Sequence, residues 1–495
     1  MAPPPTARSL TRWRPLDTLS VGGWTILVIA ALSSVAIAAW PVATRDGLQM
    51  WIFAKNHQVL YEPMFAERNL RAAEDPDQEA VVSTLLDGSA MLRRLLAGFW
   101  GDTPLPDMVE VETNMMSRFT SGPLESMGFV DLTDRLRAEG LDERINPPSF
   151  TPWTTRGRIF GIPHDVHPTA LAYRADLFAE AGIDVDAIET WDDFERLTQP
   201  LLADDDGDGE PDHYPLAIWY SDIGTIETLL FQADGGYFRP DGTPALDRAA
   251  NASVVARVVG WCFGEDRIAI DAPKFTFSGN QLKLQGRVAC EIMPDWLIGV
   301  WKRELPGLGG KFKLMPLPAW EPGGRRISVM GGTMLGFPKR TLRSRGDGSG
   351  EPSFEAAWSF AMDLYFDRDY AQRLYESTSI ISPLTDLWSE SFYHEPDPFF
   401  GGQRVGTLLL GLAPDVPARV PSPFIEAARL RMTEVLGAVY RHAEATGAHD
   451  AATLEPLAME LLAEAQARLA EEMSRNVFLQ AGAAGPAAAA GGAVP

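Results

Sequence analysis

Short apolar segments alternate with helical segments along most of the chain, and this alternation constrains the fold more than any other feature. Residues 48–53 have the composition of a buried strand, and the residues after them have helical periodicity. A second strand is entered from a Pro-Asp turn within 102–112, and similar segments recur as RIFGIP, YPLAIW, VACEIM and TMLGFPK. Short strands separated by helices of about ten or more residues are typical of a doubly wound α/β architecture. We therefore predict an α/β fold of this kind.

Length and charge limit the classes of function. The chain has 495 residues, which is too long for one ordinary core, so we expect two or three domains, or two lobes that share a hinge. Asp and Glu number 67 and Lys and Arg number 43, so the formal net charge is −24. This charge repels polyphosphate, and nucleic acid is therefore not an expected partner. The sequence leaves open whether Cys262 and Cys290 are buried thiols or form a disulfide.

The N-terminus, residues 1–45, has the pattern of an export segment. Arginines precede an uncharged apolar run at 24–43, which is close to the ~20 residues that a bilayer crossing needs. Ala36 and Ala38 have the spacing of a signal-peptide cleavage site, whereas the continuation of the run to Trp40 fits a membrane anchor. Both alternatives stay open: a cleaved signal, or a transmembrane segment through which the chain contacts the membrane. In either case we expect the rest of the chain outside the cytoplasm.

A set of segments, taken in order, resembles a known family. The segments span most of 48 to about 473, and they are PLPDMVEVE, GRIFGIPHDVHPTALAYRADLFAEAGI, TWDDFERL, LLFQADGGYF, LQGRVACEIMPDWLIG, LPAWEPGG, SVMGGTMLGFPK and EAAWSFAMDLYFDRDYAQRLY. Each segment alone is unspecific, but their order is similar to that of the extracellular solute-binding proteins of ABC sugar transporters, family 1, which includes maltose-binding protein. In TWDDF, Thr190 can cap a helix and Asp193 can complete a capping box.

The resemblance implies a two-lobed periplasmic-binding-protein fold of type II, in which each lobe is a doubly wound sheet. It places the first lobe at 46–161 plus 332–382 and the second lobe at 162–331 plus 383–475. Composition predicts a disordered tail at 476–495. Two lobes joined by a few crossing segments can close over a solute by a hinge motion.

The same resemblance implies a carbohydrate ligand and an ABC permease with cytoplasmic ATPase subunits as partners. A sugar site needs aromatic surfaces surrounded by carboxylates or amides. Residues of these types stand at the ends of the predicted strands, and glycines bring the backbone close to the solute. The predicted contacts are Asn56, His57, Glu112, Asn114, Asp165, His167, Trp219, Tyr220, Asp222, Trp296, Gly331, Gly332 and Thr333. Alternation along the strand predicts that only one of Trp219 and Tyr220 points inward.

Enzymatic and sensory functions are the alternatives. The chain lacks H-E-x-x-H, G-x-S-x-G and Walker motifs, its seven histidines form no catalytic pattern, and no catalytic cofactor is expected. His164 and His167 have a metal-like spacing but no evident further ligand. A carbohydrate-cleaving enzyme would need only two carboxylates, which the sequence does not exclude. A sugar-sensing or structural ectodomain on the same fold, without a permease partner, is not distinguished from transport either.

The acidic loop LLADDDGDGEPDHYPLA, residues 201–217, has two interpretations. Asp204, Asp206, Asp208 and Asp212 stand at the first, third, fifth and ninth positions of a calcium loop, and the Glu210 carbonyl would supply a backbone ligand. The twelfth position, however, is Pro215 instead of the bidentate glutamate of an EF-hand. The loop is therefore either a structural Ca²⁺ site away from the solute or a solvated acidic turn.

Overall fold

The structure is a computed structural model, and it describes residues 20–39, 47–75, 78–101, 103–264, 267–339 and 354–476. The chain forms two structural units, Met1–Asp46 and Gly47–Pro495. In the first unit, the described residues of the predicted apolar run belong to helix α1 (Val21–Ala39), and residues 40–43 of that run lie outside the described range. No helix among the described residues is long and apolar enough to cross a membrane.

The first sheet of the second unit is built from two distant stretches of the chain. Its strand order is β2-β1-β3-β13-β6, and β1 pairs in parallel with both β2 and β3. Strand β13 returns from much later in the chain and pairs antiparallel with both β3 and β6. The strands are β1 (Leu48–Ile52), β2 (Val81–Leu85), β3 (Met108–Glu112), β6 (Ile162–Pro163) and β13 (Thr333–Gly336).

The second sheet has the order β11-β7-β10-β8-β9, and β12 pairs with β7 beside β11. Strands β8, β9 and β10 run parallel to one another, while β7 is antiparallel to β10. The strands are β7 (Pro168–Arg174), β8 (Tyr214–Ile218), β9 (Ala269–Asp271), β10 (Val288–Pro294), β11 (Phe312–Met315) and β12 (Ser328–Val329). A separate hairpin pairs β4 (Thr154–Thr155) with β5 (Arg158–Ile159).

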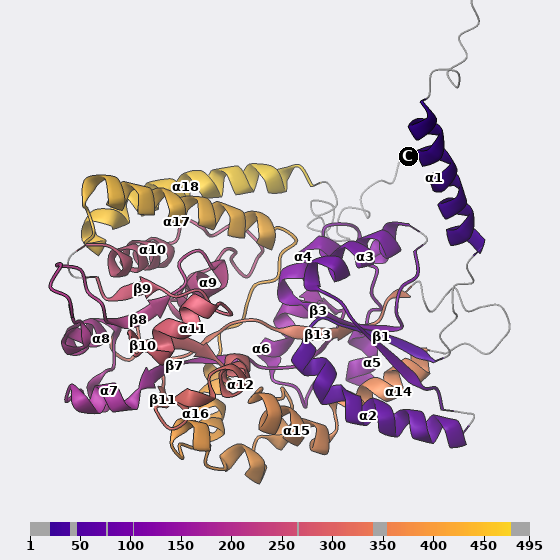
Figure 1. The fold of residues 1–495 in the computed structure, drawn as a ribbon, viewed down its shortest axis with the longest axis horizontal. Helices are drawn as coiled ribbons and strands as arrows, with labels where there is room; N and C mark the ends of the chain where they lie inside the picture. The colour runs from indigo at the N-terminus through magenta and orange to yellow at the C-terminus, as the bar shows by residue number, and fades with distance from the viewer. Residues whose placement is uncertain are drawn as a thin grey trace, which may run out of the picture. The chain divides into compact units, whose positions relative to one another are not determined.

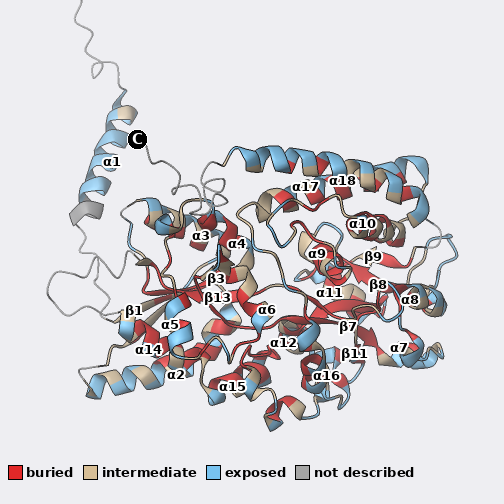
Figure 2. Ribbon diagram, turned by 180° about the vertical axis from the view of Figure 1, so that it is seen from behind, coloured by how far each residue is buried: buried red, intermediate tan, exposed pale blue. Residues whose placement is uncertain are grey.

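Helices cover both faces of each sheet, which confirms the predicted doubly wound α/β fold (Figure 1). The core of one face of the first sheet includes residues of α2, α5, α14 and α15, and the core of the other face includes residues of α3 and α4. Residues of α8, α9, α10, α17 and α18 pack on one side of the second sheet, and residues of α12 and α16 on the other. Strands β7, β8 and β10 are buried at every position, as expected for strands covered on both faces (Figure 2).

The helices of this unit are α2 (Lys55–Glu74), α3 (Gly88–Trp100), α4 (Thr113–Thr120), α5 (Thr133–Ala138), α6 (Pro147–Phe150), α7 (Ala175–Glu180), α8 (Trp191–Leu197), α9 (Ile223–Gln232), α10 (Ala249–Cys262), α11 (Phe277–Leu284), α12 (Asp295–Glu304), α14 (Phe354–Tyr365), α15 (Arg368–Thr378), α16 (Val405–Leu412), α17 (Ile425–Thr446) and α18 (Ala451–Ser474). The predicted capping box of Thr190 and Asp193 opens α8. Cys262 and Cys290 are both free thiols.

The two sheets take their strands from ranges of the chain that are similar to the ranges of the two predicted lobes. The first sheet takes strands from 48–163 and 333–336, and the second takes strands from 168–329. Ile162 and Pro163, which the predicted division assigns to the second lobe, pair instead with β13 of the first sheet. The exact lobe boundaries stay a prediction, and most of the predicted tail, 477–495, lies outside the described residues.

Gly299 offers a test of the packing that holds helix α12 in place. A Cβ atom at Gly299 would lie 2.5 Å from the Thr378 carbonyl oxygen, which belongs to the backbone of α15. We expect Gly299→Ala to destabilise the fold by about 1–3 kcal/mol because the two helices must separate. Gly411 in α16 is the control, since a Cβ there meets no atom within 4 Å. Gly411→Ala should therefore be neutral or slightly stabilising, and urea unfolding of the two variants measures the difference.

Candidate solute-binding site

A cavity of about 470 Å³ lies where strands of both sheets end. It takes Glu112 from the end of β3, residues that follow the ends of β8 and β10, and residues of the helices after these strands. Ligands of open α/β sheets bind outside the carboxyl ends of the strands, so this is the position at which a site is expected. The predicted contacts that line the cavity are Glu112, Asn114, Trp219, Asp222, Trp296 and Gly331.

Glu112 and Asn114 form a polar group on the first-sheet side of the cavity. Glu112 ends β3, and Asn114 lies in the first turn of α4. The Asn114 side-chain amide donates to Glu112 Oε2 at 2.9 Å. Burial raises the pKa of Glu112, although the hydrogen bond from the Asn114 amide and the charge of Arg429 act in the opposite direction. This pair offers a solute both hydrogen-bond donors and acceptors.

Trp219 and Asp222 follow β8 on the second-sheet side. Trp219 lines the cavity, whereas Tyr220 is exposed and packs on Tyr440 with ring centroids 5.0 Å apart. The two aromatic residues, which follow β8, thus lie on different sides of the chain, one at the cavity and one at the surface. Asp222 caps α9, because its carboxylate accepts from the backbone N–H groups of Gly224 and Thr225 at 3.2 Å. Its oxygens are therefore engaged in holding the helix start that faces the cavity.

Trp296 stands in the first turn of α12 and is fixed by two contacts. Its indole Nε1 donates to the Met330 carbonyl at 3.0 Å, and its ring stacks on Phe275 with centroids 5.9 Å apart. Gly331 lies directly against it with φ +93°, and a Cβ there would come within 3.1 Å of Trp296 Nε1. Glycine is thus needed at 331, both for the backbone conformation and for the close approach.

Several cavity residues were missed by sequence reasoning, among them Lys274, Phe275, Arg419 and the Glu227–Arg429 pair. Arg429 binds both carboxylate oxygens of Glu227 at 2.7 and 2.8 Å. Arg419 Nη1 donates to the Gly331 carbonyl at 2.5 Å, and burial lowers the pKa of Arg419 to about 10. Arg419 and Arg429 come from a loop and a helix far from any strand end in sequence, whereas Lys274 and Phe275 follow the end of β9 by a few residues. The Pro-flanked PARVP segment around Arg419 was the one local sign of a constrained loop.

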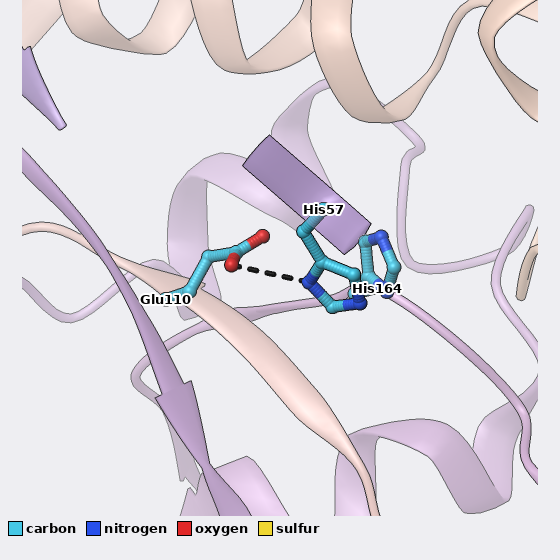
Figure 3. Close-up of side chains that lie close together, drawn as sticks. All are labelled: His57, Glu110 and His164. Carbon is cyan, nitrogen blue, oxygen red and sulfur yellow. Dashed lines mark hydrogen bonds and ion pairs between the residues drawn. The ribbon is translucent and has the colours of Figure 1, made fainter. Parts of the chain in front are cut away.

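His57 lies in the core of the first sheet instead of in the cavity. It is 4% exposed, and its Nδ1 lies 3.2 Å from Glu110 Oε2 (Figure 3). Tyr61 and Tyr365 donate their hydroxyls to the other oxygen of Glu110. A buried carboxylate needs hydrogen-bonding partners. This need explains why His57, a polar residue after the first strand, points into the core and not into the cavity. Asn56, beside it, is half-buried and does not line the cavity.

His164 joins this buried cluster from the crossing segment. Its ring centroid lies 4.5 Å from that of His57, and possible metal-ligating atoms of His57, Glu110 and His164 lie within 4.8 Å of one another. However, both ring nitrogens of His164 already have partners, Tyr370 Oη at 2.8 Å and Asp165 Oδ2 at 3.0 Å. The geometry is therefore that of a hydrogen-bonded network.

Asp165 and His167, both predicted to contact the solute, form a buried ionic triad with Asp295. His167 Nε2 lies 3.0 Å from Asp165, and its Nδ1 lies 2.7 Å from Asp295. Burial alone would lower the pKa of His167, but the two carboxylates outweigh it and raise the pKa to about 10. The imidazole is thus a cation held between two anions, behind the cavity wall.

The triad ties together the segments that cross between the sheets. Asp295 Oδ2 accepts from the Ile381 backbone N–H at 2.9 Å, and Asp295 Oδ1 accepts from that of Trp296 at 2.7 Å. Asp165 Oδ1 lies 3.4 Å from the backbone nitrogen of Thr333. Thr333 is buried, and the Gly332 carbonyl accepts from the Thr113 N–H at 3.0 Å, so neither residue lines the cavity. These predicted contacts support the site from behind.

The acidic loop brings three of its predicted ligands together. Oxygens of Asp204, Asp206 and Asp208 lie within 4.8 Å of one another, and all three residues are exposed. Asp212 instead pairs with Arg287 at 2.9 Å, and the Glu210 carboxylate pairs with Arg267. Asp204 accepts backbone N–H groups of Gly207 and Gly209, so the turn also has internal hydrogen bonds. Calcium binding by this loop stays a prediction.

The family model described as bacterial extracellular solute-binding protein matches residues 59–341, and the chain belongs to this family. The chain is 24% identical over 425 residues to the arabinooligosaccharide-binding protein of Bacillus subtilis (strain 168), covering 83% of this chain and 92% of that relative. It is also 24% identical over 397 residues to the lactose-binding protein of Rhizobium radiobacter, covering 79% and 87%. Both relatives are named as binding proteins.

Solved structures support the two-lobed fold. The crystal structure of an extracellular solute-binding protein of family 1 matches with a TM-score of 0.64 at 18% identity, covering 85% of this chain and 99% of that one. The sugar-binding protein MalE of Xanthomonas citri matches with a TM-score of 0.63 at 18% identity, covering 84% and 97%. The predicted two-lobed fold is thereby confirmed, and the family model confirms the predicted family.

Replacing His167 tests the ionic triad. His167→Gln leaves two buried carboxylates without their cation, and we expect a loss of about 3–5 kcal/mol in the free energy of unfolding at pH 6. Because the folded pKa of His167 is raised, its contribution is complete below the unfolded pKa of about 6.5. In the wild type this contribution is lost as the pH rises toward 10.

Urea unfolding at pH 6 and pH 9 measures both effects. His442, an exposed residue of α17, provides the control, and His442→Gln should unfold like the wild type. A His167→Gln variant as stable as the His442→Gln control would contradict the triad.

Proposed function

We propose that the chain binds an oligosaccharide in this cavity, outside the cytoplasm, and delivers it to an ABC permease whose cytoplasmic ATPase subunits drive uptake. The observation that carries the proposal is the cavity wall: Trp219 and Trp296 supply apolar ring faces, and Glu112 and Asn114 supply polar groups beside them. Sugars present C–H faces and hydroxyls that match these two kinds of surface. The family is extracellular, and relatives are named for arabinooligosaccharides and lactose.

The mechanism is binding without covalent chemistry. A solute that contacts both sides of the cavity stabilises a closed arrangement of the lobes only by its higher affinity for that arrangement. The closed, loaded form is then the one that the permease recognises. Gly331 and Gly332, both with positive φ, lie in the segment that leads into β13 and supply backbone conformations that other residues rarely adopt.

The N-terminal segment fits this location. We propose that the basic residues and the apolar run export the chain, either as a cleaved signal or as an anchor to the membrane. Mass spectrometry of the mature N-terminus from the producing cell distinguishes these, because cleavage after Ala38 removes most of the run.

A carbohydrate panel with a Trp296 variant tests binding. Wild-type protein should show a saturable rise in melting temperature with one or more oligosaccharides, and the sugar should be recovered unchanged. Trp296→Ala should lower the affinity by about 1–3 kcal/mol, or roughly 5- to 150-fold, because a large apolar contact is removed. Isothermal titration calorimetry gives the affinities.

Trp100 is the matched control, since it is 78% exposed at the end of α3 and does not line the cavity. Trp100→Ala should bind like the wild type. Cleaved sugar at the end of the titration would favour the hydrolase alternative. If the protein binds the sugar tightly but the cell takes up that sugar equally well without the protein, a sensing ectodomain would be favoured.

We propose in addition that the acidic loop binds a structural calcium ion through Asp204, Asp206 and Asp208, in agreement with their converging oxygens. At a calcium concentration 100 times the dissociation constant, we expect the folded state to gain about 2.7 kcal/mol. The melting temperature should rise with calcium and fall on adding EGTA, and Asp206→Asn should abolish the response. A melting temperature that changes with neither calcium nor EGTA would identify a solvated acidic turn.

A further inference from the structure

Phe275 has a conformation and an exposure that folding alone does not explain. Its φ is +60°, in the left-handed region, and its side chain is 57% exposed. This region is unfavourable for a residue with a Cβ atom, and a bulky side chain there is an outlier. An exposed phenyl ring also recovers little of the hydrophobic free energy that burial would give. Such local strain is characteristic of functional sites.

The neighbours of Phe275 hold it in this conformation. Lys274 is buried, and its ammonium donates to Thr225 Oγ1 at 2.8 Å. Thr276 Oγ1 donates to the Pro273 carbonyl at 2.8 Å and accepts from the Gly279 N–H at 3.1 Å, which caps α11. The turn is therefore anchored on both sides of Phe275, and its ring is presented outward.

The ring of Phe275 extends the aromatic surface of Trp296. Both residues line the cavity, and their rings are nearly parallel, with an angle of 19° and centroids 5.9 Å apart. Ring contact at about 3.5–4 Å then leaves a lateral offset of about 4–5 Å between the two rings. A sugar ring between them would need about 7–8 Å, so a ligand must lie along the stepped surface and not between the rings.

We propose that Phe275 is a second aromatic platform, which stacks on the sugar ring next to the one held by Trp296. This inference rests on the proposed function, and it makes Phe275 a determinant of ligand length. A monosaccharide on Trp296 does not reach Phe275, whereas an oligosaccharide covers both rings. The alternative role is packing alone, in which Phe275 serves only to hold Trp296.

Phe275→Gly separates these roles, because glycine accepts the left-handed conformation and removes the exposed ring. We expect its melting temperature to be equal to or above that of the wild type. The affinity for oligosaccharides should fall about tenfold or more, the scale of one lost aromatic contact, while the affinity for the corresponding monosaccharide stays within about twofold. The probes are arabinotriose, lactose and maltotriose, each compared with its monosaccharides by calorimetry.

Phe277 provides a matched control, since it is 80% exposed, begins α11 and does not line the cavity. Phe277→Ala should leave every affinity unchanged. A Phe275→Gly variant that binds oligosaccharides like the wild type would overturn the platform. Equal losses for oligosaccharides and monosaccharides, together with a lower melting temperature, would show packing alone. A wild type that binds none of the sugars would instead argue against the proposed function.

Discussion

The buried charge of His167 is the interaction on which the site depends. The imidazolium lies between Asp165 and Asp295, and each carboxylate also accepts from a backbone N–H of another crossing segment or lies close to one. Desolvating three charges is costly, so the arrangement persists only while all of its partners stay in place. The position of α12, and with it the position of Trp296, is therefore coupled to the backbone at Thr333 and Ile381. The triad therefore helps to fix the position of Trp296 in the cavity wall.

The polar network continues from the triad into the first sheet. His164 links Asp165 to Tyr370, and Glu110 lies nearby among Tyr61, Tyr365 and His57. Each member satisfies a group that would otherwise be buried without a partner, so a change at one point affects the others. Gly331 and Gly332, which lead from the crossing segments into β13, both have positive φ, and Gly331 lines the cavity.

The fold was predictable because it depends on local periodicity, whereas only part of the site was. Glu112, Trp219 and Trp296 follow directly from strands, and the carboxyl end of a strand fixes where the next side chains go. His57, Asp165 and His167 also come after strands, but each of them pairs with a buried charged residue. The sequence does not reveal which residues pair in this way. Phe275 and Arg419 come from loops whose approach to the cavity depends on tertiary contacts. Ile162 and Pro163 show the same limit, because a strand returning from residue 333 decides their sheet.

The charges around the cavity determine which groups remain for a solute. The two oxygens of Glu227 are bound by Arg429, and those of Asp222 cap α9. Glu112 has only the Asn114 amide as a hydrogen-bond partner, and Arg419 only a backbone carbonyl, among the contacts of the described residues. A sugar hydroxyl can donate to Glu112 and accept from Arg419 without displacing an existing ion pair. The paired charges thus keep the cavity wall in shape, and the partly satisfied groups, together with the aromatic rings, are what a neutral solute can engage.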